Sequence, residues 1–293
     1  MKSINKEDEI AILIVASVLI LTGTLASAFK TPSLNPRLAQ ENCTVIKTWE
    51  MPMELNEISG IAWIGEGKIA CVQDEDGIIF IYDLDGNKVQ KTVNFAKSGD
   101  YEGITVVDGT AYVLRSDGAL FEIQNYLQNN LEVKIHETPF SDKNDMESLA
   151  HDKENHRLLL IPKEKDLKNE DFLGVYTFNL KSKEMDSNPI LKIKFDDPIF
   201  ENEKEDGDKE PSNAIFPSDM AISPLNGDYY IVEGKEPKIL ILDKAGKSIK
   251  MTNLSKKKFS QPEGIIFSPE GTMYISNEGK KGKANIMEVE LDR

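Results

Sequence analysis

An acidic residue opens a short strand-like run at five places in the chain, and the spacing of these places constrains the fold most. The runs read EISGIAWIG, EGITVVDG, ESLAHDKENH, DMAISPLNG and EGIIFSPEG, and they begin at Glu57, Glu102, Glu147, Asp219 and Glu263. Their separations are 45, 45, 72 and 44 residues. A period near 45 residues with several short β-rich runs per repeat is typical of propeller blades. The sequence therefore predicts an all-β protein, a β-propeller of about five four-stranded blades.

The chain also contains a run that can close such a ring. Each repeat holds short β-branched and aromatic runs bounded by Gly, Asp, Asn and Pro, as strands and turns are. The last repeat ends after three runs, whereas residues 44–51 form a strand-like run that belongs to no repeat. We therefore expect this N-terminal run to be the fourth strand of the last blade, which leaves no long open sheet edge. Six blades stay an alternative, because the 72-residue separation has room around the acidic stretch 196–216.

An apolar segment precedes the repeats. Residues 10–29 are 20 positions without a charged side chain, which is enough for a helix to cross a bilayer. The segment ends in Ala26-Ser27-Ala28, which resembles a signal-peptidase site, but its flank MKSINKEDE carries three acidic residues beside two lysines. We predict an uncleaved transmembrane helix, with a cleaved signal as the alternative. The expected parts are a membrane anchor or signal segment at 1–29, a linker at 30–43 and a propeller domain at 44–293.

This organisation and the charge of the chain set expectations for location and partners. An anchored chain lies in the plasma (inner) membrane with its propeller facing the periplasm or exterior, and a cleaved one is secreted or periplasmic. Contact with the membrane is expected through the N-terminal helix. The 35 basic and 50 acidic residues give a net charge of −15, which disfavours nucleic acid and is compatible with a cation. We expect a monomer.

The cysteines and histidines give no motif of their own. Cys43 and Cys71 are the two cysteines, and they either form a disulfide or are buried as apolar residues. His151 and His156 flank the turn DKEN and are expected at the surface. No nucleophile elbow, phosphate loop or dinucleotide fingerprint is present in the sequence.

The acidic strand starts predict a cation site. The innermost strand of each blade lines the central channel, so its first residues lie at one mouth. Five carboxylates that converge there cannot all stay ionised unless some take up protons or a cation lies among them. Carboxylate oxygens suit calcium best. The predicted metal ligands are Glu57, Glu102, Glu147, Asp219 and Glu263, with Asp100 and Asp145 in support. A carboxylate that accepts backbone N–H groups and ties blades together needs no metal, and this alternative stays open.

The ends of the second strands return to the same mouth and carry polar residues. They predict a small substrate-binding site above the metal, formed by Asp74, Arg115, Lys163, Glu233 and Asn277. In the alternative interpretation, Arg115 and Lys163 only neutralise neighbouring acids.

Four stretches resemble a known family: NEISGIAW, QDEDGIIFIYDLDG, GDYEGITVVDGTAYVLRSDG and SQPEGIIFSPEGTMYISNEG. On these motifs, over residues 45–290, the chain resembles the SdiA-regulated family, the YjiK/CarP group. The resemblance implies a β-propeller, an extracytoplasmic or inner-membrane location and a link to calcium. It also implies a hydrolase activity such as that of a phytase, without assigning catalytic residues. The chain departs from the E-G-I pattern of its other repeats at Glu147-Ser148-Leu149 and Asp219-Met220-Ala221.

Together these observations predict a membrane-anchored extracytoplasmic propeller that binds calcium at one channel mouth. It would act as a binding or sensing module in calcium homeostasis. The alternative is a metal-dependent hydrolase, lactonase-, esterase- or phytase-like, that acts on a small substrate at the same site, because a bound metal can polarise a substrate oxygen.

Overall fold

The computed structural model describes residues 43–168, 171–203, 215–280 and 282–292 of the 293-residue chain. The predicted anchor or signal segment at 1–29 and nearly all of the linker at 30–43 lie outside these residues. Within the described ranges, no helix has the length and apolar character needed to span a membrane.

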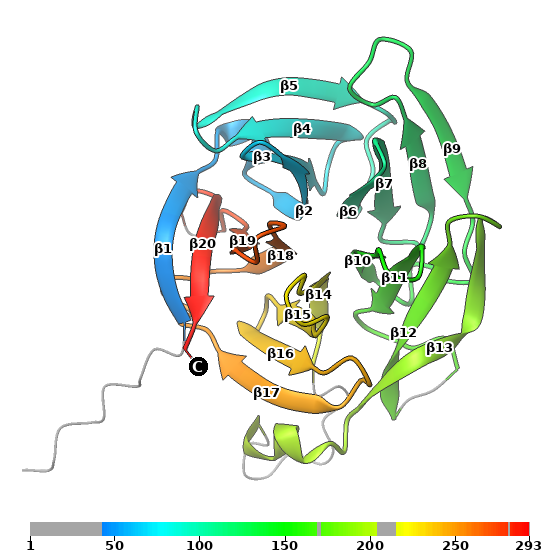
Figure 1. Cartoon of the computed structure of the whole chain (residues 1–293), viewed down its shortest axis with the longest axis vertical. Coiled ribbons are helices and arrows are strands. Elements are labelled where there is room, and N and C mark those ends of the chain that lie inside the picture. The colour runs from blue at the N-terminus through cyan, green and yellow to red at the C-terminus, as the bar shows by residue number, and fades with distance from the viewer. Residues whose placement is uncertain (1–42, 169–170, 204–214, 281, 293) are drawn as a thin grey trace, which may run out of the picture. The chain divides into compact units, whose positions relative to one another are not determined.

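The strands of the described residues form five four-stranded antiparallel sheets around a central axis (Figure 1). Blade one contains β2 (Ile58–Gly65), β3 (Lys68–Gln73), β4 (Ile78–Asp83) and β5 (Lys88–Asn94). Blade two contains β6 (Tyr101–Val107), β7 (Thr110–Arg115), β8 (Leu120–Gln124) and β9 (Glu132–His136). Blade three contains β10 (Met146–Asp152), β11 (Arg157–Pro162), β12 (Phe172–Asn179) and β13 (Glu184–Lys194). Blade four contains β14 (Pro217–Ile222), β15 (Tyr229–Glu233), β16 (Lys238–Leu242) and β17 (Ser248–Asn253).

Blade five joins the two ends of the propeller sequence. It contains β18 (Pro262–Phe267), β19 (Met273–Asn277), β20 (Asn285–Leu291) and, as its outer strand, β1 (Cys43–Glu50). β1 pairs antiparallel with β20 from Cys43 opposite Leu291 to Glu50 opposite Asn285. The five-blade prediction and the closure by the N-terminal strand are therefore confirmed. A short 3₁₀ helix, η1 (Met53–Leu55), leads from β1 into blade one.

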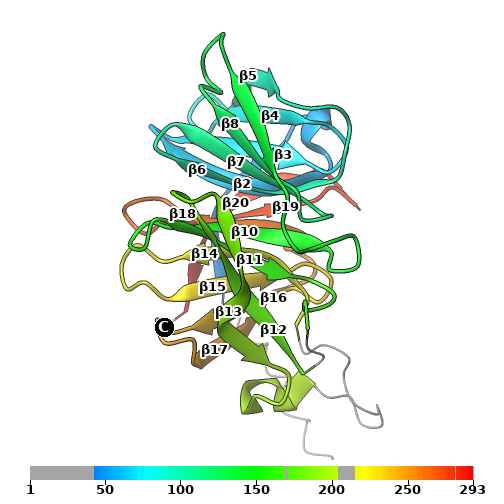
Figure 2. The same cartoon turned by 90° about the vertical axis from the view of Figure 1, so that its right-hand side faces the viewer.

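The long separation between the third and fourth repeats belongs to blade three and to the connection after it. β13 is 11 residues long, and it is followed by a 3₁₀ helix, η2 (Pro198–Glu203), which lies beside the outer strand of blade four (Figures 1 and 2). Ser248 at the start of that strand donates a hydrogen bond of 2.8 Å to Asp197, just before η2. The described part of this separation therefore contributes no further blade.

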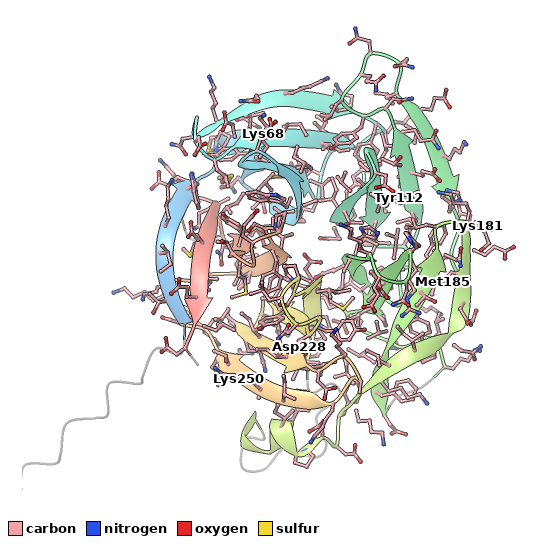
Figure 3. All side chains as sticks on the ribbon, viewed as in Figure 1. Lys68, Tyr112, Lys181, Met185, Asp228 and Lys250 are labelled. Carbon is pink, nitrogen blue, oxygen red and sulfur yellow. The ribbon has the colours of Figure 1, made fainter. Side chains whose placement is uncertain are left out.

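Apolar side chains hold neighbouring blades together. The buried apolar residues of the described part form clusters that each combine residues of two adjacent blades. One cluster, for example, joins Val72 and Phe95 of blade one to Tyr101 and Phe121 of blade two, with aromatic centroids 4.9–5.7 Å apart. Side chains fill the space between the blades, whereas the exposed Lys181 points away from the ring (Figure 3). The clusters between blades fix the blade packing, since an isolated four-stranded sheet has two faces to cover.

The two cysteines are separate and buried. Cys43 lies in β1 of blade five and Cys71 in β3 of blade one, and both side chains are buried. They belong to different apolar clusters, so they pack as small apolar residues rather than as a disulfide.

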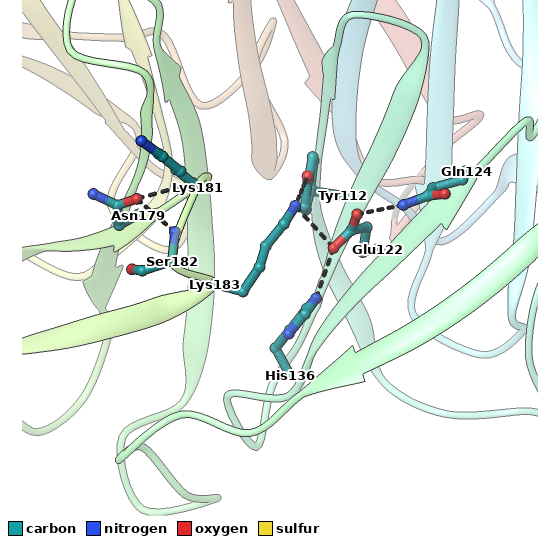
Figure 4. A network of polar contacts seen from close by, with 8 residues as sticks. All are labelled: Tyr112, Glu122, Gln124, His136, Asn179, Lys181, Ser182 and Lys183. Atoms are coloured by element: carbon teal, nitrogen blue, oxygen red, sulfur yellow. Dashed lines mark hydrogen bonds and ion pairs between the residues drawn. The ribbon is translucent and has the colours of Figure 1, made fainter.

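The buried carboxylate of Glu122 links blades two and three on their outer side (Figure 4). Glu122 of β8 accepts hydrogen bonds from Gln124 and His136 at 2.8 Å each and pairs with Lys183 at 2.9 Å. Lys183 comes from the turn before β13 of blade three and also donates to the Tyr112 hydroxyl at 2.7 Å. Burial raises the pKa of Glu122, but these donors more than offset that effect and bring it to about 2.

We expect the contacts of Glu122 to make the free energy of unfolding depend on pH in the acid range. Because the folded-state pKa of Glu122 is below the usual value of 4.5, its stabilisation is present above that value and is lost as pH falls toward 2. Urea unfolding of the wild type and of Glu122→Gln at several pH values between 7 and about 2 tests this. The free-energy gap between the two proteins should shrink as the pH falls, and a gap that stays constant over the range would contradict the prediction.

Candidate functional site

The pairing between the first two strands of each blade shows which residues of the five inner strands are equivalent. Near the start of every inner strand the register shifts: between Ile58 and Ile61, Tyr101 and Gly103, Met146 and Ser148, Pro217 and Asp219, and Pro262 and Gly264. Alignment on these shifts gives one residue per blade at the channel opening, a set that we call the mouth ring. Its members are Ser59, Glu102, Glu147, Ser218 and Glu263.

The mouth ring includes three of the five predicted ligands, and the other two occupy different rows. Glu57 precedes Ser59 by two residues and shares a row with Asp100 and Asp145. The backbone carbonyls of Glu57, Asp100 and Asp145 accept a hydrogen bond from the residue after the second strand, at 3.4, 3.0 and 2.9 Å. Asp219 lies one residue beyond the mouth ring, in the row that glycine occupies in other blades.

In that glycine row, neighbouring inner strands approach one another closely. A Cβ on Gly60 would lie 2.6 Å from the backbone oxygen of Glu102, and one on Gly103 would lie 2.8 Å from the backbone oxygen of Glu147. Both distances are shorter than van der Waals contact, so a side chain at either position would push two blades apart.

Blade four has Asp219 at this position, and its carboxyl bridges the strands on either side. Its oxygens accept hydrogen bonds from the backbone N–H of Leu149 in blade three at 3.4 Å and of Ile265 in blade five at 2.9 Å. The residue is 3% exposed. Burial raises the pKa of Asp219 to about 8, although its backbone donors lower it in part. Asp219 thus has the arrangement anticipated for a carboxyl that ties blades together.

The three glutamates of the mouth ring are close enough to affect one another. Burial and repulsion from Glu147 raise the pKa of Glu102 well above its usual range. Burial raises the pKa of Glu147 to about 8, and the ion pair with Lys163 offsets only part of this effect. Burial also raises the pKa of Glu263, against the attraction of Lys163. The ring therefore places three carboxyl groups together beside Lys163, and their raised pKa values mean that they hold protons more readily than isolated glutamates do.

Glu57 is part of a carboxyl pair beside the ring. Hydrogen bonds from Glu278 and from Asn56, the latter at 2.7 Å, lower the pKa of Glu57. Burial, together with the bond to Glu57, raises the pKa of Glu278 to about 8. The proton of this pair therefore resides on Glu278, and Glu57 is the ionised partner.

Two of the five residues predicted to form the substrate-binding site, a set that we call the collar, face the mouth. Lys163 follows β11 and pairs with Glu147. Asp74 follows β3, and burial together with repulsion from Glu57 and Asp100 raises its pKa to about 6. Its Oδ1 is buried, and among the described residues it has no hydrogen-bond partner.

The other three collar residues make contacts within their own blades. Arg115 forms two bonds to Asp117, at 2.9 and 2.6 Å. Glu233 is 2% exposed and lies 3.5 Å from Lys238. Asn277 is fully buried and donates to Asn285 at 3.0 Å.

The mouth offers oxygen donors without a preformed ligand cluster. Among the residues that the structure describes, no three His, Cys, Asp or Glu side chains are already grouped as a metal site. Glu147 Oε2 is nevertheless a buried carboxylate oxygen that has no hydrogen-bond partner in the same residues. The donor chemistry therefore fits a hard cation such as calcium, and ligation would require the glutamates to turn toward a common point.

The register of the mouth could have been found in the sequence. An alignment that matches the acidic residues puts Glu57 and Asp219 in the wrong row. The reason is that the acid does not stand at the same distance from the register shift in every inner strand. Alignment on the pattern S-G-I, E-G-I, E-S-L, S-D-M and E-G-I places Ser59 and Ser218 with the three glutamates. The sequence predicts Lys163 either as a substrate-site residue or as a counter-ion of neighbouring acids, and its partner Glu147 becomes known only from the strand pairing.

Comparison with solved structures supports the fold. The glutaminyl cyclase of Myxococcus xanthus has a TM-score of 0.58 at 13% identity, covering 85% of this chain and 96% of that chain. A protein of unknown function from Bacteroides thetaiotaomicron has a TM-score of 0.52 at 12% identity, covering 85% of this chain and 76% of its own. Identities this low show a shared propeller architecture and no shared chemistry.

At the level of sequence, the comparisons reach one family. No curated protein matches the chain. The family model described as SdiA-regulated matches residues 38–279, which covers most of the propeller and all five residues of the mouth ring. The chain therefore belongs to the SdiA-regulated family.

Proposed function

We propose that the mouth ring binds calcium and that the protein is a binding or sensing module in calcium homeostasis. One observation carries the proposal: Glu102, Glu147 and Glu263 gather at one channel mouth with Lys163 as their nearby cation, and Glu147 Oε2 is buried without a partner in the described residues. A divalent cation would replace the protons that these carboxyls otherwise hold. Glu102, Glu147 and Glu263 would hold it, with Asp100, Asp145 and Asp74 around them.

The location belongs to the same proposal. The apolar segment 10–29 would anchor the chain in the plasma membrane, with the propeller in the periplasm or outside the cell. A chain cleaved after residue 28 would carry the same mouth as a secreted or periplasmic protein.

Calorimetric titration of the full-length protein with calcium tests the site. We expect saturable binding by the wild type and about tenfold or weaker affinity for Glu102→Gln and Glu263→Gln, because each variant removes one ligand charge. Glu132→Gln, an exposed acid on the outer strand of blade two, is the matched control and should bind as the wild type does. Absent binding by a folded wild type, or equal affinity in all four proteins, would refute the proposal.

A substitution of Lys163 provides a second test of the calcium site. Its ammonium competes with an added cation for the same carboxylates, so Lys163→Met should unfold more readily without calcium and gain more thermal stability on calcium addition than the wild type. Hydrolysis of an ester, lactone or phosphate monoester by the calcium-loaded protein would instead favour the hydrolase alternative at this mouth.

A further inference from the structure

The channel end opposite the mouth ring opens into a cavity of about 930 Å³. The residue four positions beyond each mouth-ring residue, about 13 Å along an extended strand, is half-buried and lines the channel in every blade. We call these residues the floor ring: Trp63, Val106, His151, Ile222 and Phe267. Trp63, His151, Ile222 and Phe267 also line the cavity, so its floor is the channel end itself.

The floor ring is apolar except for one imidazole. His151 Nε2 is buried and has no hydrogen-bond partner among the described residues. Burial lowers the pKa of His151, so its imidazole is neutral at pH 7. His151, predicted at the surface, is half-buried at the cavity, and its Nε2 atom is covered by the channel end. Buried polar atoms in native proteins nearly always have a partner, and an orphaned one at a cavity floor points to a ligand group.

Two aromatic residues of the floor ring pack against further aromatic rings. Trp63 stacks on Tyr274 with centroids 5.5 Å apart and planes at 21°. Phe267 lies edge-on to Tyr230 at 5.0 Å and 79°. Side chains that are held in place lose little conformational entropy when a ligand arrives, so this floor is preorganised for a flat apolar group.

The rim of the cavity differs in charge from the rest of the protein. Its lining carries the cations Lys153, Arg157 and Lys244 against the acids Asp152 and Glu154, on a chain whose net charge is −15. Arg157 pairs with Asp152 at 2.8 Å. Lys153 and Lys244 therefore outnumber Glu154 on the rim, and this balance favours an anion over a cation.

We propose that this cavity is a second ligand site, for a small organic acid with an aromatic or branched apolar body. The body packs between Trp63, Ile222 and Phe267, and a carboxylate oxygen accepts a hydrogen bond from His151 Nε2. The lysines of the rim draw the anion in. The site is separate from the mouth ring and does not depend on calcium binding there.

A set of three related probes tests the ligand class on the full-length protein. The probes are 3-phenylpropionate, its neutral amide and 3-phenylpropylammonium, titrated by calorimetry with tryptophan fluorescence as a second readout. We expect saturable binding of the carboxylate with a Kd at or below about 1 mM, weaker binding of the amide and none of the ammonium. No saturation by the carboxylate, or equally tight binding of the ammonium, would overturn the proposal.

Two pairs of variants locate the binding. His151→Asn should weaken carboxylate binding about fivefold, whereas His156→Asn, outside the cavity and with a φ of 50° that asparagine tolerates, should not. Lys244→Glu should weaken it about threefold or more, whereas Lys247→Glu on the same turn should have little effect. All four positions are half-buried or exposed, so the variants should fold. Affinity unchanged in both His151→Asn and Lys244→Glu would refute the assignment of the probe to this cavity.

Discussion

Replacing Trp49 with alanine should destabilise the propeller by about 3–5 kcal/mol, the range for large aromatic truncations in a core. Trp49 lies in β1, the strand that closes blade five, and is 5% exposed. Its Nε1 donates a hydrogen bond of 2.7 Å to the carbonyl of Leu84 in blade one, and its ring lies 6.1 Å from Tyr274. The substitution therefore leaves a cavity and an unpaired carbonyl where the ring closes.

Urea unfolding measures this effect, and a neighbour on the same strand provides the control. Ile46 is 50% exposed, so Ile46→Ala removes apolar atoms from β1 without opening the core. We expect its free energy of unfolding to stay within about 0.5 kcal/mol of the wild type. Equal losses in the two variants would mean that Trp49 has no special part in closure.

Asp219→Ala should have an effect of similar size. The carboxyl of Asp219 satisfies the backbone N–H groups of Leu149 and Ile265, which belong to the blades on either side. Its loss leaves two buried donors unpaired, at a cost of about 1–3 kcal/mol for each. Asp219→Asn keeps one acceptor oxygen and should recover part of this loss. Urea unfolding of both variants at pH 7 gives the comparison.

An aspartate with the same type of bonds at an exposed site isolates the contribution of burial. Asp243 accepts the backbone N–H groups of Ala245 and Lys247 at 2.9 Å each, in an exposed turn of blade four. Water can replace its oxygens, so Asp243→Ala should cost no more than about 1 kcal/mol. A loss as large as that of Asp219→Ala would show that the link between blades contributes nothing extra.

The sequence alone determined the architecture. The spacing near 45 residues predicts the blades, and the unmatched run at residues 44–51 predicts the strand that closes the ring. These predictions succeed because they depend on repetition and on strand-length apolar runs, which are local properties of the chain. The position of three carboxylates at one channel mouth follows from the same repeat.

The exact composition of the mouth was decided by the strand pairing. Glu57 and Asp219 begin their runs as Glu102 does, yet the register shifts place Glu57 two residues before the mouth ring and Asp219 one residue beyond it. The offset of one residue turns the side chain of Asp219 to the other face of its strand. The acidic residues alone do not distinguish Glu57 and Asp219 from Glu102, whereas the three-residue pattern that starts at each mouth-ring position does.

Contacts between distant segments decided the remainder. Lys163 meets Glu147 only when β10 and β11 pair, and Asp219 bridges residues 70 and 46 positions away in sequence. His151 reads as a surface residue beside a turn, but closure of five blades turns it into the channel beside Trp63 and Phe267. The sequence specifies each strand by its own residues, whereas the channel exists only after all five blades have closed around it.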